Sequence, residues 1–217
     1  VTHFWSLAVE EQFYIIWPII IFILFFLFRK KQVVGFILFL LMAASTVWMG
    51  ILYEPGEDPT RVYYGTDTRA FSLIVGALLA FVWPSRQLSA DIGKGAKALL
   101  DFVGFTSLVL IIILMNAIDQ FDPILYYGGM LLISGLMAIA IAVAAHPASF
   151  FGKLLSIKPL EWVGLRSYGI YLWHYPIIML VGSSYYNDGT WSGTVAFQSA
   201  LVLLLSDLSW KLIEDPT

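Results

Sequence analysis

Residues 3–28 of the chain read HFWSLAVEEQFYIIWPIIIFILFFLF, and this stretch decides the fold. From residue 15 to residue 28 it carries no charged side chain. A helix needs about 20 mostly apolar residues to cross the hydrocarbon core of a membrane. The apolar run and the residues before it supply that length, so the stretch predicts a membrane-spanning helix with Glu10 and Glu11 near its beginning.

The composition extends this prediction to the whole chain. Hydrophobic residues make up 59% of the 217 residues and charged residues only 12%, whereas soluble domains carry about 25% charged residues. The apolar runs are continuous, which favours helices over a barrel, whose strands alternate apolar and polar residues. The chain has no cysteine, which excludes disulfides and cysteine-based zinc sites. The sequence therefore predicts an all-α, polytopic bundle of transmembrane helices.

About seven segments are long enough, or nearly long enough, to span a membrane. They are residues 13–28, 33–52, 68–83, 98–118, 124–145, 167–181 and 194–213. The third and sixth are short, and we expect each to include flanking polar residues. Ten of the 12 basic residues then fall on one side of the membrane, and only Arg61 and Arg69 on the other. Basic residues accumulate in cytoplasmic loops, so we expect the Val1 end outside the cell membrane and the Thr217 end in the cytoplasm.

The first segment carries ionisable groups beside hydrocarbon, where such groups are costly and usually serve a function. If its helix begins near Ser6, a good N-cap type, Glu10 and Tyr14 share one face. Trp5 and Tyr14 can be explained as an interfacial belt that anchors the helix. One carboxylate would suffice for a helix cap, so we interpret the adjacent pair Glu10 and Glu11 as functional.

Two other segments place polar groups in or next to apolar spans. Asp67 and Arg69 are two residues apart and do not face each other on a helix, so we expect each to have a partner on another helix. The two residues either form an interhelical ion pair or belong to a site in which Arg69 stabilises negative charge. His174 lies beside Tyr171 in the sixth segment, and it is either hydrogen-bonded structurally or part of a functional polar cluster. His146, next to a proline at a helix end, is interpreted as structural.

Two further patterns concern packing. Asp207 and Lys211 are spaced for an i, i+4 ion pair near the end of the chain. Small residues at spacings that permit close helix contact are Gly76, Ala80, Gly128, Gly129 and Gly135. We expect these small residues to lie in helix contacts.

Four stretches occur in a fixed order: HFWSLAVEEQFYIIWP, YYGTDTRAFSLIVGALLAF, WVGLRSYGIYLWHYPI and a terminal IEDP. Together they resemble the successive signatures of the acyltransferase-3 family, multi-spanning membrane enzymes that O-acylate, usually O-acetylate, sugars of cell-surface glycans. The resemblance implies that residues 1–217 are a partial acyltransferase-3 transmembrane domain. Val1 lies within the first signature, so we expect further helices upstream, including the His and Arg residues that are often taken as catalytic in this family.

The resemblance also implies a function. The expected reaction moves an acyl group, expected to be acetyl, from a cytoplasmic acyl-CoA to a hydroxyl of a bacterial cell-surface glycan such as peptidoglycan, O-antigen or exopolysaccharide. Acetyl-CoA is then the cosubstrate, the glycan and the lipid bilayer are the partners, and no bound cofactor, metal or nucleic acid is expected. The alternative is a transporter or flippase that uses the same charges as a proton relay or substrate site, although no inverted repeat is visible.

The site residues follow from the ionisable groups near the spans and from the matching signatures. The expected catalytic residues are Glu10, Glu11, Arg69 and His174. The expected substrate-binding residues are His3, Trp5, Ser6, Tyr14, Asp67 and Tyr171.

Overall fold

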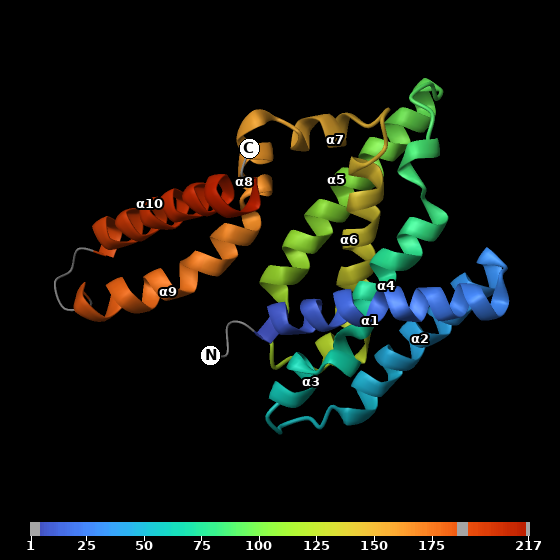
Figure 1. Ribbon diagram of the computed structural model, residues 1–217, viewed down its shortest axis with the longest axis horizontal. Coiled ribbons are helices and arrows are strands. Elements are labelled where there is room, and N and C mark those ends of the chain that lie inside the picture. Colours follow the sequence, from blue (N-terminus) through green and yellow to red (C-terminus); the bar gives the residue numbers. More distant parts are fainter. Residues whose placement is uncertain (1–4, 186–190, 216–217) are drawn as a thin grey trace. The chain divides into compact units, whose positions relative to one another are not determined.

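The computed structural model describes residues 5–185 and 191–215 (Figure 1). All regular structure in these residues is helical, and six of the helical segments are long and apolar enough, by length and composition, to cross a membrane. The prediction of an all-α, polytopic membrane protein is confirmed. The chain divides into two compact units, Val1–Leu154 and Leu155–Thr217, and each is described by itself.

The first unit is built from consecutive helices. They are α1 (Trp5–Phe28), α2 (Lys31–Leu52), α3 (Thr60–Tyr64), α4 (Thr66–Val82), α5 (Lys94–Ala117), α6 (Met130–Ala144) and α7 (Phe150–Leu155), with a 3-10 turn η2 (Ser85–Gln87) before α5 and a π-type turn η3 (Leu125–Gly129) before α6. α2 packs on α4, α4 on α6, and α5 runs beside α6 (Figure 1). α3 and α4 together form one candidate span, so the short third segment does include flanking polar residues, as expected.

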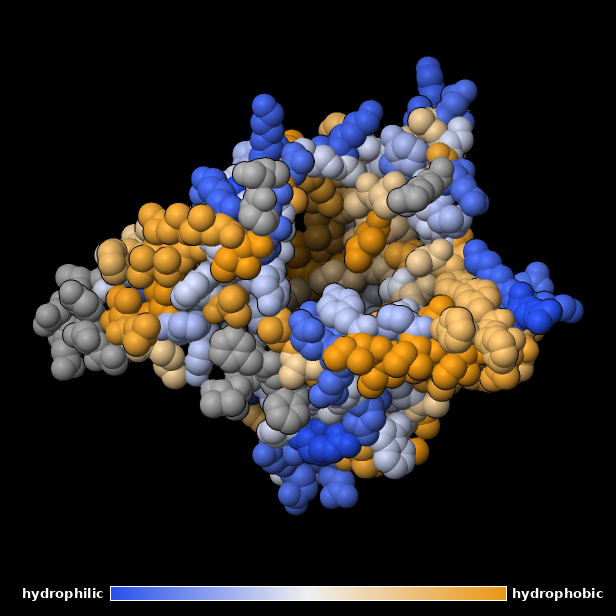
Figure 2. Space-filling model, in the orientation of Figure 1, coloured by the Kyte–Doolittle hydropathy of each residue, from blue (hydrophilic) through white to orange (hydrophobic). Residues whose placement is uncertain are grey.

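α1 exposes a continuous apolar surface. Figure 2 shows this surface as an apolar band along the helix, and Phe22 and Phe26 are each 71% exposed. The opposite side of α1 packs through Trp17 against the buried residues Val34 and Leu38 of α2. α1 therefore buries little of its surface in the first unit and exposes much apolar area. Such a surface suits contact with lipid.

An apolar cluster lies where α2 ends and where α3 and α4 begin. Its buried members are Met49, Tyr53, Val62, Phe71, Leu125, Tyr126 and Met130. The rings of Tyr53 and Tyr126 stack with centroids 4.2 Å apart. The hydroxyl of Tyr126 donates a hydrogen bond of 2.7 Å to the carbonyl oxygen of Gln120, so this buried phenol has a polar partner. Through Val62, the cluster fixes α3 against α2.

A carboxylate on α5 holds the beginning of α7. Asp101 Oδ1 accepts hydrogen bonds from the backbone N–H groups of Phe150 (2.8 Å) and Phe151 (3.0 Å) and from the hydroxyl of Ser149 (3.2 Å). The first N–H groups of a helix have no partner within it, and Asp101 satisfies two of them. This charge on an apolar helix is therefore structural.

His146 also makes local structural contacts, as predicted. Its Nδ1 accepts a hydrogen bond of 3.1 Å from the backbone N–H of Ala148. Its ring lies 5.9 Å from the ring of Trp83, whose indole N–H donates to the carbonyl oxygen of Ala142. These contacts fasten the end of α6 to the end of α4.

Three of the glycines chosen by their spacing do not lie in close helix contacts. Gly76, Gly128 and Gly135 have open space where a side chain would begin, so the prediction for these three is wrong. The tight contact occurs instead at Gly104 of α5, which lies against Val143 and Phe151. Spacing of small residues does not reveal which face of a helix is buried, and Gly76 is exposed on the first unit.

Replacing Gly104 with alanine is expected to destabilise the protein. An added Cβ would lie 2.7 Å from Cγ1 of Val143 and 3.0 Å from the ring of Phe151. Alanine favours a helix interior over glycine by about 1 kcal/mol, but overpacking costs roughly 1–3 kcal/mol. Thermal unfolding of the detergent-solubilised protein would measure the balance. Gly76→Ala is the matched control and is expected to be neutral or stabilising; equal stability of the two variants would contradict the close contact.

The second unit is a helical pair with short flanking elements. It contains α8 (Lys158–Leu165), α9 (Ser167–Tyr185), α10 (Trp191–Ser209) and the π-type turn η4 (Trp210–Glu214). α9 packs along α10, and the absence of a side chain at Gly169 lets its backbone approach Ser206. α9 is helical as predicted, but it is not one of the six candidate spans found among the described residues. Its first half contains tyrosines, a histidine and a proline, which lower its hydropathy.

A charged cluster connects the beginning of α9 with the end of α10. Nε of the buried Arg166 donates to Oδ1 of Asp207 at 2.7 Å, and Nζ of Lys211 donates to Oδ2 at 2.7 Å. The predicted i, i+4 pair of Asp207 and Lys211 is confirmed. Arg166 also lies over the ring of Trp162, at 4.5 Å from its centroid. A buried guanidinium without a partner would be costly, so Asp207 is needed to hold Arg166 in place.

Candidate functional site

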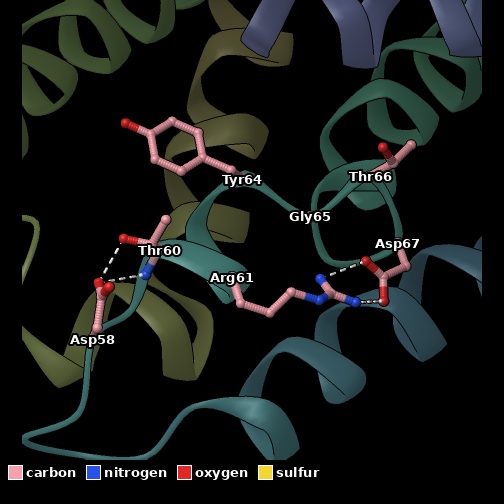
Figure 3. A pocket seen from close by; sticks show the side chains of 7 residues that line it. All are labelled: Asp58, Thr60, Arg61, Tyr64, Gly65, Thr66 and Asp67. Carbon is pink, nitrogen blue, oxygen red and sulfur yellow. Dashed lines mark hydrogen bonds and ion pairs between the residues drawn. The ribbon is translucent and has the colours of Figure 1, made fainter. Parts of the chain in front are cut away.

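A pocket of about 780 Å³ lies at the junction of α3 and α4 (Figure 3). Its lining residues are Asp58, Thr60, Arg61, Tyr64, Gly65, Thr66 and Asp67. This volume is in the range of pockets that hold small molecules, roughly 300–1,000 Å³. Charged, hydroxyl and aromatic groups face the same space, and all of them come from one short stretch of chain.

An ion pair forms one wall of the pocket. In Figure 3 the side chain of Arg61 extends to Asp67, and the two groups make a bidentate contact with Nη1–Oδ1 and Nη2–Oδ2 distances of 2.9 and 2.8 Å. Asp67 Oδ2 also accepts a hydrogen bond of 2.9 Å from the indole N–H of Trp48 on α2. The hydroxyl of Ser45 donates to the main-chain carbonyl of Asp67 at 2.6 Å. Asp67 thus has partners on α2 and α3, as predicted, and its occupied oxygens suit it to orient Arg61.

Gly65 lies beneath this ion pair. A Cβ at this position would overlap Nη1 of Arg61 and would lie 2.7 Å from both Oδ1 of Asp67 and Oγ1 of Thr68. The hydroxyl of the buried Thr68 donates to the carbonyl oxygens of Val62 (2.7 Å) and Gly65 (2.9 Å). Thr68 therefore fixes the turn between α3 and α4, and the turn leaves no room for a side chain at Gly65.

Asp58 and Thr60 form the rim of the pocket. The backbone N–H of Thr60 donates to Oδ1 of Asp58 at 3.0 Å, and the Thr60 hydroxyl donates to the same oxygen (Figure 3). These hydrogen bonds, the side-chain one first, lower the pKa of the Asp58 carboxyl below its ordinary value. Asp58 is therefore ionised at neutral pH and presents a negative charge at the pocket mouth.

Arg69 and Asp67 have different partners. Its Nε donates a hydrogen bond of 2.7 Å to the carbonyl oxygen of Tyr63, and its guanidinium lies over the Tyr63 ring at 4.4 Å from the centroid. The partner is on α3, so the expectation of a partner on another helix is confirmed. Arg69 is half-buried and is not among the residues that line the pocket. Its catalytic role stays a prediction.

The first signature meets the second at the pocket. The hydroxyl of Thr66 donates a hydrogen bond of 2.9 Å to Oε1 of Gln12 on α1. Gln12 directly follows Glu10 and Glu11, both of which are exposed and make no hydrogen bond or ion pair with another described residue. The structure therefore ties the helix that carries the two carboxylates to the edge of the pocket.

The remaining expected residues of the first signature lie at the start of α1. Trp5 and Ser6 are in its first turn, close to the predicted helix start, and Tyr14 is 66% exposed. His3 lies outside the described residues.

His174 and Tyr171 belong to α9 in the second unit. His174 Nδ1 lies 3.2 Å from the carbonyl oxygen of Ile170, and its ring centroid is 5.6 Å from that of Tyr171. A carbonyl oxygen only accepts, so Nδ1 donates in this contact. The catalytic role of His174 stays a prediction.

Sequence reasoning did not select Arg61, Asp58 or Thr60. One signal pointed to Arg61, because it is one of only two basic residues on its side of the expected topology. Asp58 and Thr60 had no comparable signal, since short polar residues near a proline are ordinary in loops.

The comparisons with known proteins identify the family of the chain. Residues 1–210 match the family described as acyltransferase domain. The chain is 44% identical to the peptidoglycan O-acetyltransferase OatA of Listeria monocytogenes and 43% identical to the putative peptidoglycan O-acetyltransferase YrhL of Bacillus subtilis, in each case over 99% of this chain and 34% of the relative. It is 38% identical to the O-acetyltransferase OatA of Staphylococcus aureus, over 99% of this chain and 35% of the relative.

The chain thus spans about a third of the length of these relatives. No solved structure matches the chain. The family match covers nearly all of the sequence and includes both helices that meet at the pocket. The chain therefore belongs to the acyltransferase domain family.

Proposed function

We propose that the protein is a membrane-bound O-acetyltransferase that moves an acetyl group from cytoplasmic acetyl-CoA to a hydroxyl of a cell-surface glycan, with peptidoglycan as the favoured acceptor. The observation that carries this proposal is the similarity of 99% of the chain to relatives named as peptidoglycan O-acetyltransferases. The pocket at the junction of α3 and α4 supports it, because charged and hydroxyl groups among its lining residues offer contacts to a polar substrate.

The proposed orientation places the Val1 end outside the cell membrane and the Thr217 end in the cytoplasm. The asymmetry of the basic residues supports this orientation, since Arg29 and Lys30 lie in the turn between α1 and α2 and Lys31 begins α2. In this orientation the pocket faces the outside, where a cell-surface glycan is found. The acetyl group must then cross the membrane from its donor.

The reaction needs two kinds of group. A base must take the proton of a weakly acidic hydroxyl, and donors must stabilise the oxyanion of the tetrahedral intermediate. We assign proton transfer and acceptor orientation to His174 and to a carboxylate of the pair Glu10 and Glu11. We assign charge stabilisation to Arg69, because its terminal nitrogens make no hydrogen bond with the described residues while Nε is held by Tyr63.

Labelled acetyl-CoA supplied to the cytoplasmic face of membrane vesicles tests the proposal. The vesicles should contain the complete protein and its glycan acceptor. Labelled acetyl ester on the glycan is the expected result. Movement of a solute across the vesicle membrane without ester formation would overturn the proposal and favour a transporter that uses the same charges.

The double variant Glu10→Gln/Glu11→Gln and the single variant Arg69→Lys are each expected to lower acetyl transfer about tenfold, which corresponds to the loss of one hydrogen bond to a charged group. The double variant is needed because either adjacent carboxylate can serve. Rates are compared at matched membrane expression, with the exposed Glu54→Gln as control. Wild-type rates in both variants would refute these assignments.

A further inference from the structure

We infer that the pocket at the α3–α4 junction binds the carbohydrate acceptor and excludes the acyl-CoA donor. This inference rests on the proposed function, because it names the substrate class of a site in the same enzyme. It is drawn from the charge, the hydrogen-bonding groups and the connections of the pocket.

The charge of the pocket disfavours an anionic ligand. Its lining holds two carboxylates, Asp58 and Asp67, and one guanidinium, Arg61. Arg61 is already paired with Asp67 in a bidentate contact, so its positive charge is offset by a carboxylate and attracts a phosphate group less. Asp58 adds an unpaired negative charge at the rim. An acyl-CoA carries several phosphate charges and would be repelled, whereas a neutral sugar meets no such penalty.

The hydrogen-bonding groups suit hydroxyls that both donate and accept. Asp58 accepts two hydrogen bonds from Thr60 at Oδ1 and keeps Oδ2 for a donor. A guanidinium carries five N–H donors, and Arg61 uses only part of them for Asp67. Donors and acceptors therefore stand within one pocket, which is the combination that a polyol requires. Tyr64 adds an aromatic side chain to the lining, suited to the apolar face of a sugar ring.

The connections of the pocket link it to the expected chemistry. Thr66 lines the pocket and donates to Gln12, which follows the carboxylate pair of α1 in the sequence. A sugar bound in the pocket would thus lie beside the contact that joins α1 to the beginning of α4. On the other side, Trp48 and Ser45 of α2 fix Asp67, so the wall of the pocket is rigid before the sugar binds.

Asp58→Asn tests the inference with little risk to folding. Asp58 is exposed, and an asparagine keeps the oxygen that accepts from Thr60 while removing the charge. In the complete protein, the KM for soluble peptidoglycan fragments is expected to rise roughly 3- to 10-fold, since one hydrogen bond contributes about 0.5–1.5 kcal/mol. The KM for acetyl-CoA should stay unchanged. Glu57→Gln removes a neighbouring exposed charge outside the pocket and is the matched control.

Direct titration of the same fragments without donor separates this inference from the proposed function. Weaker fragment binding by Asp58→Asn than by Glu57→Gln supports the assignment of the pocket. Equal binding by the wild type and Asp58→Asn overturns it, as does a change confined to the KM for acetyl-CoA. Fragment binding that depends on Asp58 without any formation of acetyl ester would overturn the proposed function and leave the pocket as a glycan site.

Discussion

Replacing Gly65 with alanine is expected to lower acetyl transfer about 10- to 100-fold without unfolding the protein. A Cβ at this position overlaps Nη1 of Arg61, and the guanidinium, as the end of a flexible side chain, is the group that moves. Its departure breaks the bidentate contact with Asp67. A displaced Arg61 can no longer hold the acceptor by a hydrogen bond. A hydrogen bond to a charged group contributes about 1.5–3 kcal/mol, which corresponds to the expected fall in rate.

The stability of the same variant should fall by roughly 1–3 kcal/mol, because the added Cβ also lies 2.7 Å from Oγ1 of the buried Thr68 and overpacks the turn. The displaced ion pair adds little to this loss. The side chains of Arg61 and Asp67 are 62% and 44% exposed, and exposed ion pairs contribute roughly 0–1 kcal/mol to stability. Thermal unfolding in detergent should therefore show a cooperative transition at a somewhat lower temperature than that of the wild type. Gly76→Ala, on the same helix α4 but in open space, is the control for the effect of alanine on the helix.

A double-mutant cycle identifies the route of the effect. If Gly65→Ala acts by displacing Arg61, it should add almost nothing to the loss caused by Arg61→Ala, because the interaction is already absent. Full additivity of the two substitutions would show that alanine at position 65 acts through another contact, such as Thr68, whose Oγ1 is 2.7 Å from the added Cβ. An unchanged rate in Gly65→Ala would remove Arg61 from the site.

The helices could be predicted from the sequence because each span depends on the sum of many apolar residues. The expected segment 33–52 is the helix Lys31–Leu52, and the expected segment 98–118 lies almost wholly within Lys94–Ala117. Contacts between residues four apart could also be predicted, because the fixed period of a helix brings such residues together. The pair of Asp207 and Lys211 is of this kind.

Contacts between helices could not be predicted. They depend on how the chain turns between helices and on which helix faces pack together, and the helical period determines neither. Arg61 reaches Asp67 only because the chain turns at Gly65 between two helices. Asp101 meets Ser149 across 48 residues of sequence. The sequence indicated that Asp67 and Arg69 would seek partners elsewhere, but the identity of those partners required the structure.

Replacing His174 with glutamine is expected to lower kcat about 10²- to 10⁴-fold, the usual contribution of a general acid or base. Its Nδ1 lies 3.2 Å from the carbonyl oxygen of Ile170, which orients the ring, and we assign to this ring the proton of the acceptor hydroxyl. Glutamine preserves an amide donor of similar reach for Ile170 but cannot accept a proton at neutral pH. The KM for peptidoglycan fragments should change much less than kcat, because His174 is not among the residues that line the pocket.

His146 provides the matched control for this experiment. Its Nδ1 accepts from the backbone N–H of Ala148, and asparagine offers an oxygen for the same hydrogen bond. His146→Asn is therefore expected to lose stability at most and to keep its rate for each folded molecule. A loss smaller than about threefold in kcat for His174→Gln would mean that the contact with Ile170 holds the ring for packing alone, and proton transfer would then have to be assigned to the carboxylates of α1.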